Sequence, residues 1–201
     1  LSETLLPNPD TLPQAADPGG AARGRERWLD QANQAGDTAL AAAMGAISDD
    51  AAGTALLNAV FGNSAYLGQC LLADAAFACR LLSEGPNAAR AHAQASLHEA
   101  ARPSVGTADI MVALRHAKRN IALLVGIADL AGTWPLETVT STLSDFADRA
   151  IGIAIAHLLY GAAAAGDLDL PDPADPQSGS GLVILGMGKL GAKELNYSSD
   201  I

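Results

Sequence analysis

The stretch that decides the fold lies at residues 182–201 and reads LVILGMGKLGAKELNYSSDI. Residues 182–185 form a short apolar run bounded by glycines, which predicts a buried β-strand. Gly186, Gly188 and Gly191 follow, and glycines let the backbone turn tightly and bring N–H groups close to an anion. Residues 198–201 then predict the start of a second strand, with Asp200 at its entrance. The order strand, glycine turn, strand points to a site that binds phosphate groups.

Three kinds of site use a glycine turn of this type. Residues 186–191 spell G-x-G-x-x-G, but dinucleotide binding also requires a long helix from the third glycine, and residues 196–199 break the apolar period. A P-loop is excluded because leucine, not serine or threonine, follows Lys189. Nucleotidyl transfer requires two carboxylates two residues apart on the next strand, where they hold paired divalent ions. Asp200 stands at the first of these positions, and its partner would follow Ile201. From the residues alone, the dinucleotide and nucleotidyl-transfer interpretations both stay open.

The stretch GMGKLGAKELNYSSDI, residues 186–201, closely resembles the signature of bifunctional glutamine synthetase adenylyltransferase/adenylyl-removing enzymes. That family carries two copies of a nucleotidyltransferase domain of the DNA polymerase beta superfamily. LLNAVFGNS at residues 56–64 and LRHAKRN at residues 114–120 are similar to helical segments of the same family. The ELNYSSD wording resembles the N-terminal copy, which implies phosphorolytic removal of AMP from a glutamine synthetase tyrosine.

The resemblance also implies roles for individual residues. Five residues are expected to bind the nucleotide: Gly186, Gly188, Lys189, Gly191 and Ser199. Asp200 is expected to be catalytic and to hold Mg²⁺. The implied nucleotides are ATP, ADP or AMP as substrate or product. The implied partners are glutamine synthetase and a nitrogen-signalling regulatory protein.

Composition narrows the class of protein. With 49% hydrophobic but only 4% aromatic residues, the core is expected to consist of aliphatic side chains between helices. The net charge of −10 argues against a general nucleic-acid binder. Cys70 and Cys79 are expected to be buried thiols in a reducing cytoplasm. No apolar span is long enough for a membrane helix.

The chain before the glycine turn predicts a mainly α region that leads into the first strand and turn of an α/β nucleotidyltransferase domain. Residues 1–20 are expected to be a flexible lead-in, 21–166 a helical region, 167–181 an acidic linker rich in Pro, Gly and Ser, and 182–201 the start of the catalytic domain. Hydrophobic spacing, caps and breakers predict eight helices, at residues 23–35, 37–47, 50–61, 64–72, 74–83, 87–101, 107–131 and 136–165. Because the sequence begins at Leu1 and ends inside a motif, we expect it to be part of a longer protein.

Other charged groups have simpler interpretations. Arg115, His116, Lys118 and Arg119 are expected to form a solvated helix face, with contact to nucleotide phosphate or an acidic partner as the alternative. Asp145 and Asp148, one turn apart on a helix, are expected to be exposed rather than catalytic. The alternative from a different class of function is an interaction module, in which the helical region binds glutamine synthetase or its regulator.

Overall fold

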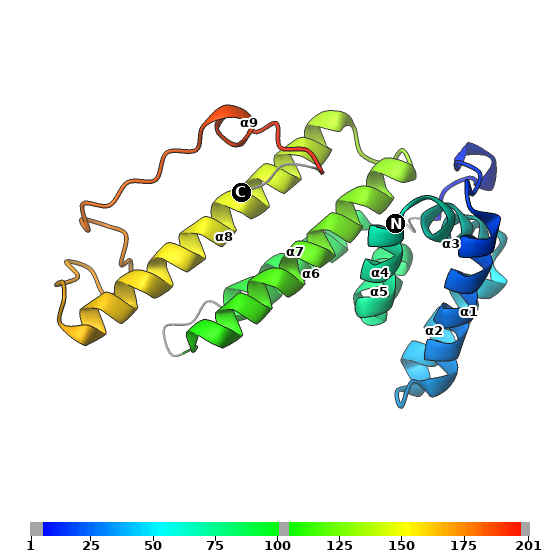
Figure 1. The fold of residues 1–201 in the computed structure, drawn as a ribbon, viewed down its shortest axis with the longest axis horizontal. Coiled ribbons are helices and arrows are strands. Elements are labelled where there is room, and N and C mark those ends of the chain that lie inside the picture. Colours follow the sequence, from blue (N-terminus) through cyan, green and yellow to red (C-terminus); the bar gives the residue numbers. More distant parts are fainter. Residues whose placement is uncertain (1–5, 101–104, 198–201) are drawn as a thin grey trace. The chain divides into compact units, whose positions relative to one another are not determined.

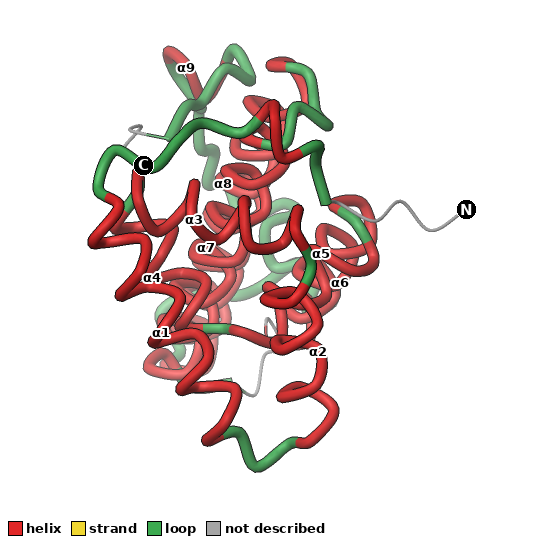
Figure 2. Tube along the Cα trace, turned by 90° about the vertical axis from the view of Figure 1, so that its right-hand side faces the viewer, coloured by secondary structure: helices red, strands yellow, loops and turns green. Residues whose placement is uncertain are grey.

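The computed structural model describes residues 6–100 and 105–197 of the 201-residue chain. Within those ranges the chain consists of helices and connecting loops, without a strand (Figures 1 and 2). The helices are η1 (Pro9–Thr11), α1 (Pro18–Gln34), α2 (Thr38–Asp49), α3 (Ala51–Asn63), α4 (Ala65–Ala73), α5 (Ala75–Glu84), α6 (Pro86–Ala100), α7 (Thr107–Leu130), α8 (Leu136–Ala165) and α9 (Gly188–Gly191).

The mainly α prediction is confirmed, and each of the eight predicted helices is present. The largest difference is α1, which begins at Pro18 rather than near Arg23. Asp17 caps its N-terminus, since its Oδ1 accepts a hydrogen bond from the Gly20 N–H at 2.8 Å. Pro18 occupies the first helical position, where its missing N–H costs nothing.

The predicted strand at residues 182–185 is wrong for the described part of the chain. These four residues lie in a connecting segment without strand pairing, and they are 49–78% exposed. The sequence pattern is that of a strand, but a strand forms only when a neighbour accepts and donates its backbone hydrogen bonds. No such neighbour exists among the described residues. The predicted second strand, at residues 198–201, lies outside them.

The chain divides into two compact units. Unit 1 comprises Leu1–His92 and Arg119–Leu136, and unit 2 comprises Ala93–Lys118 and Glu137–Ile201. Helices α6 and α7 each run through both units.

Unit 1 is built around a core of large side chains that are less than 2% exposed. They are Trp28, Met44, Leu56, Leu57, Val60, Leu71, Leu81, Leu82, Leu123, Leu124 and Ile127. Trp28 reaches from α1 to α2, where its indole N–H donates to the carbonyl oxygen of Met44 at 3.1 Å. A buried indole therefore keeps its hydrogen bond, and the core contains aliphatic side chains as the composition predicts.

Short polar side chains start the successive helices of unit 1. Asp37, Asp50, Ser64 and Asp74 each accept a hydrogen bond from a backbone N–H in the first turn of the following helix. Asp74 also binds a second partner, because its Oδ2 accepts from the Asn120 side chain of α7 at 3.0 Å. Asn120 is 6% exposed, so this bond satisfies an amide that is almost fully buried.

The residues just before α1 are attached to α3. The Asn63 side chain accepts from the Ala16 N–H and donates to the Gln14 carbonyl oxygen, each at 3.1 Å. The Asp17 N–H donates to the carbonyl oxygen of Gly62 at 3.0 Å. These bonds hold the end of the lead-in segment against unit 1.

The two cysteines are free and buried, as the sequence predicts. Burial raises the pKa of the Cys79 thiol from 9.0 to about 11. Among the described residues no single helix is long and apolar enough to cross a bilayer; only the pair α4 and α5 passes on length and composition, and it is bent by 98°.

Candidate functional site

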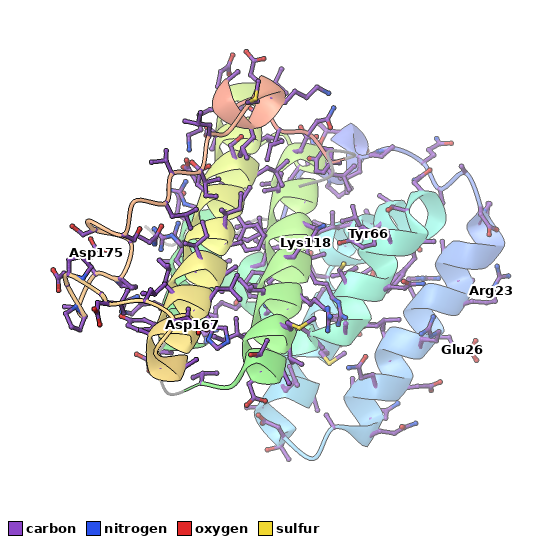
Figure 3. All side chains as sticks on the ribbon, turned by 60° about the vertical axis from the view of Figure 1, so that its left-hand side comes forward. Arg23, Glu26, Tyr66, Lys118, Asp167 and Asp175 are labelled. Carbon is purple, nitrogen blue, oxygen red and sulfur yellow. The ribbon has the colours of Figure 1, made fainter. Side chains whose placement is uncertain are left out.

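The candidate site is the glycine turn at residues 186–191, which lies in unit 2 beside α8 (Figure 1). After α8 ends, Gly166 adopts φ +80° and the chain reverses direction. Asp167 and Asp175 project from the loop that follows (Figure 3). The chain then runs back along α8 towards the N-terminal half of that helix.

Hydrogen bonds fasten this returning segment to α8 at successive points. The Tyr160 hydroxyl donates to the Pro173 carbonyl oxygen at 3.1 Å. Closer to the middle of the helix, the Gln177 side chain donates to the Gly152 carbonyl oxygen at 3.3 Å. The acidic linker is thus attached to α8 in its second half, and it delivers the glycine turn to one face of that helix.

The turn has the backbone geometry that its glycines allow. Gly188 has φ +56°, a conformation in which a side chain would be strained. A Cβ at Gly191 would lie 2.3 Å from the Gly186 carbonyl oxygen, so a larger residue would open the turn. The Ala192 N–H donates to the Gly188 carbonyl oxygen at 3.0 Å, and the Glu194 N–H donates to that of Lys189 at 2.7 Å. Gly186, Gly188 and Gly191 therefore lie within one tight turn, and their binding of a nucleotide stays a prediction.

The N-terminus of α9 has no side-chain cap, because the residue before it is Met187. The first N–H groups of any helix have no partner inside that helix. Here they belong to Gly188, Lys189 and Leu190, and the Lys189 side chain is exposed beside them. Donors and a positive charge at one turn suit an anionic group such as phosphate.

A groove of about 500 Å³ lies between the turn and α8. Its lining is mostly apolar and includes Ile151 and Ile155 of α8 with Ile184, Met187 and Leu190 of the returning segment. Leu182, Val183 and Leu185 are also 49–78% exposed. Residues 182–185 therefore present an apolar surface beside the turn.

The structure adds a residue that the sequence reasoning missed. Lys193 Nζ lies 3.0 Å from Asp145 Oδ1 and also forms an ion pair with Asp148, both on α8. Hydrogen bonds from Lys193 to Asp148 and then to Asp145 raise the pKa of the lysine. The two carboxylates are 61% and 50% exposed, as predicted, but they hold the end of the turn rather than standing free. The available signal was the one-turn spacing of the aspartates together with a second lysine after the glycines.

The next anchor is the backbone of Leu195. Its N–H donates to the Ser144 hydroxyl at 3.2 Å, while that hydroxyl donates to the Thr140 carbonyl oxygen at 2.8 Å. Ser144 is fully buried, and the Leu195 side chain is 5% exposed. The segment after the glycine turn is consequently packed onto α8 by both a charged and a buried contact.

Two of the predicted site residues, Ser199 and Asp200, lie outside the described residues. Within the described ranges, no group of three or more His, Cys, Asp or Glu side chains is placed to hold a metal ion. Carboxylates are the ligands that Mg²⁺ prefers. Asp200 is of the right chemical type, and its fit to Mg²⁺ remains a prediction.

The dinucleotide interpretation requires a helix of several turns that opens at the third glycine. In the structure the helix lies within the glycines instead, since α9 covers Gly188–Gly191 and ends there. Lys193, with φ +60°, then leads the chain out of the helix. This geometry does not match a dinucleotide fingerprint.

Comparison with known proteins agrees with the motif. A family model described as glutamate-ammonia ligase adenylyltransferase matches residues 54–201. A bifunctional glutamine synthetase adenylyltransferase/adenylyl-removing enzyme of Bradyrhizobium sp. (strain ORS 278) is 42% identical over 146 residues, which are 73% of this chain and 15% of that protein. The protein of the same description from Rhizobium meliloti (strain 1021) is 50% identical over 103 residues, or 51% of this chain and 10% of that protein. The protein of the same description from Bradyrhizobium sp. (strain BTAi1 / ATCC BAA-1182) is 38% identical over 165 residues, which are 82% of this chain and 17% of that protein. The chain therefore spans less than a fifth of the length of these relatives. No solved structure matches it.

Proposed function

Because the chain belongs to the glutamate-ammonia ligase adenylyltransferase family, we propose that it is part of a longer enzyme that adenylylates and deadenylylates glutamine synthetase. We assign it to the half that removes AMP. The wording ELNYSSD at residues 194–200 supports this assignment, since it resembles the N-terminal copy of the catalytic domain. Glutamine synthetase is the proposed protein substrate, and a nitrogen-signalling regulatory protein is the proposed effector.

The observation that carries the proposal is the glycine turn. Its backbone folds so tightly that Gly191 lies against the Gly186 carbonyl, and Lys189 stands exposed between these glycines. We propose that the N–H groups at Gly188 and Lys189, with the Lys189 ammonium, bind phosphate oxygens of the nucleotide. Ser199 is the further proposed nucleotide contact.

The proposed reaction is phosphorolysis. An oxygen of inorganic phosphate attacks the phosphorus of the tyrosyl-AMP linkage in line with the leaving group, and a new P–O bond forms as the bond to the tyrosine oxygen breaks. The products are ADP and tyrosine, whose oxygen takes a proton. Asp200 is the proposed ligand of Mg²⁺, which when bound supplies charge neutralisation at the transferring phosphoryl group.

The proposed compartment is the cytoplasm. The two cysteines are free and buried, which suits a reducing environment.

The experiment that tests the proposal uses the full-length protein containing this sequence. Adenylylated glutamine synthetase is incubated with that protein, Mg²⁺ and ³²P-labelled inorganic phosphate. The proposal predicts label in the β position of ADP, with the unmodified synthetase as the blank. Release of unlabelled AMP would mean hydrolysis instead, and would contradict the proposal.

A pair of charge-removing variants tests the role of the turn in the same assay. Lys189→Met is expected to raise KM for phosphate, because inorganic phosphate becomes the β-phosphate of ADP and the substitution removes a positive charge from the proposed phosphate contact. Arg27→Met is the control, since Arg27 is an exposed cation of α1 outside the glycine turn. Equal effects of the two substitutions would argue against a phosphate contact at Lys189.

A further inference from the structure

The contacts of Lys193 attach the chain to α8 just after the glycine turn. The chain contains three lysines, Lys118, Lys189 and Lys193, and two of them lie in the same short stretch. They behave differently. Lys189 is exposed and has no ion pair among the described residues, whereas Lys193 pairs with Asp145 and Asp148.

The two aspartates are spaced to receive one ammonium group. Residues three apart on a helix lie on the same face, so Asp145 and Asp148 present their carboxylates together. Either carboxylate alone is exposed and would hold a lysine weakly. Two carboxylates on one side of a rigid helix restrict the direction from which the lysine can approach, which makes the pair more specific than a single surface ion pair.

The backbone around Lys193 is also fixed. Lys193 has φ +60°, the left-handed conformation that non-glycine residues seldom adopt. Two residues later, the Leu195 N–H is bound to the buried Ser144 hydroxyl, and the Leu195 side chain is 5% exposed. An unfavourable backbone conformation persists when surrounding contacts determine it. Here the ion pairs on one side and the Leu195 anchor on the other do so.

We propose that Lys193 is a positioning residue: together with Ser144, Asp145 and Asp148 of α8, it fixes the path of the chain from the glycine turn towards Asp200. Helix α8 of the helical region would then hold the start of the catalytic site in place. We call the attachment of residues 193–195 to α8 the docking. The docking rests on the contacts of Lys193 and Leu195, and its consequence for catalysis rests on the function proposed above for Asp200.

The docking is tested in the 201-residue chain by hydrogen exchange at the Leu195 amide, resolved by NMR. Lys193→Met is expected to speed exchange about two- to fivefold, the effect of losing one or two exposed ion pairs. Lys193→Arg keeps the charge and is expected to exchange at close to the original rate. Lys189→Met is the matched control in the same stretch, and is expected to leave the Leu195 rate unchanged.

Exchanging the charges of Asp148 and Lys193 tests the ion pair between these two residues specifically. Asp148→Lys alone is expected to speed Leu195 exchange, and the combination of Asp148→Lys with Lys193→Asp is expected to restore part of the protection. Glu137→Gln removes a different carboxylate from the first turn of α8 and serves as the control. The docking is wrong if Leu195 exchanges at the same rate in all these variants.

The catalytic consequence is tested in the full-length protein by steady-state phosphorolysis. A positioning role predicts that Lys193→Met lowers kcat by up to about fivefold, no more than the loss of one or two exposed ion pairs weakens the docking, with KM for adenylylated glutamine synthetase unchanged because a displaced reacting group costs rate rather than binding. Recovery of kcat in the charge-exchanged double variant would support the role; an unchanged kcat in Lys193→Met would overturn it. If the unaltered protein shows no phosphorolysis while the exchange rates differ as expected, the proposed function fails and the docking stands.

Discussion

The contact of Phe61 with two glycines gives the sharpest stability prediction for unit 1. A Cβ placed on Gly24 of α1 would lie 2.2 Å from Phe61 Cγ and 2.5 Å from its Cβ. A Cβ on Gly68 of α4 would lie 2.8 Å from the Cδ1 atom of the same ring. Because the closest atoms belong to the base of the side chain, Phe61 cannot avoid a new methyl group by rotating its ring alone. The helices α1 and α3 would have to separate.

The cost of Gly24→Ala follows from two opposing terms. Overpacking of this severity costs about 3 kcal/mol. Alanine regains about 1 kcal/mol relative to glycine in a helix interior. We therefore expect the free energy of unfolding to fall by about 2 kcal/mol, which lowers Tm by about 4–8 °C. Urea unfolding followed by tryptophan fluorescence measures the change, since both tryptophans, Trp28 and Trp134, are buried and belong to the same unit.

Two further variants make the reasoning refutable. Gly161→Ala on α8 meets no atom within 4 Å, so it is expected to leave stability unchanged or raise it by up to about 1 kcal/mol. Combining Gly24→Ala with Phe61→Leu is expected to cost less than the sum of the single changes, by about 1 kcal/mol or more, because the smaller side chain makes room. Additive effects, or a Gly24→Ala variant as stable as the original, would refute the close packing.

Three other predictions concern the cap, a thiol and catalysis. Asp74→Ala removes both the cap of α5 and the acceptor for buried Asn120, so the free energy of unfolding should fall by about 2 kcal/mol; an unchanged urea midpoint would contradict this. Because burial raises the pKa of Cys79 from 9.0 to about 11, the unfolded thiol ionises first, and stability should decline as pH rises through that interval. Cys79→Ala should reduce the decline seen in unfolding curves between these pH values, and an identical decline in the variant would assign it to other groups. The isolated 201-residue chain should be inactive, since Asp200 supplies one of the two carboxylates that the proposed pair of metal ions requires. Mg²⁺-dependent phosphorolysis by the purified chain would disprove this.

The helical part of the fold was predictable because its signals are local. Asp37, Asp50, Ser64 and Asp74 stand at helix starts, and glycine with φ +80° ends α8 at Gly166. The start of α1 was missed because the pair Gly19-Gly20 looks like loop, although Asp17 and Pro18 form a good helix start.

The apolar run at residues 182–185 shows the limit of such signals. Its residue types favour a strand, but a strand depends on pairing with another segment, and the described residues provide none. The contacts of Lys193 could not be predicted from local sequence either. They join positions 45 and 48 residues apart, and only the path of the returning segment brings them together.

Asp200→Asn in the full-length protein separates the proposed site that removes AMP from a site that adds it, when both activities are measured on the same preparation. We expect ADP formation from adenylylated glutamine synthetase and phosphate to be lost, while ATP-dependent adenylylation of the unmodified synthetase continues. Loss of adenylylation with phosphorolysis retained would assign the chain to the opposite half of the enzyme and contradict the proposed function.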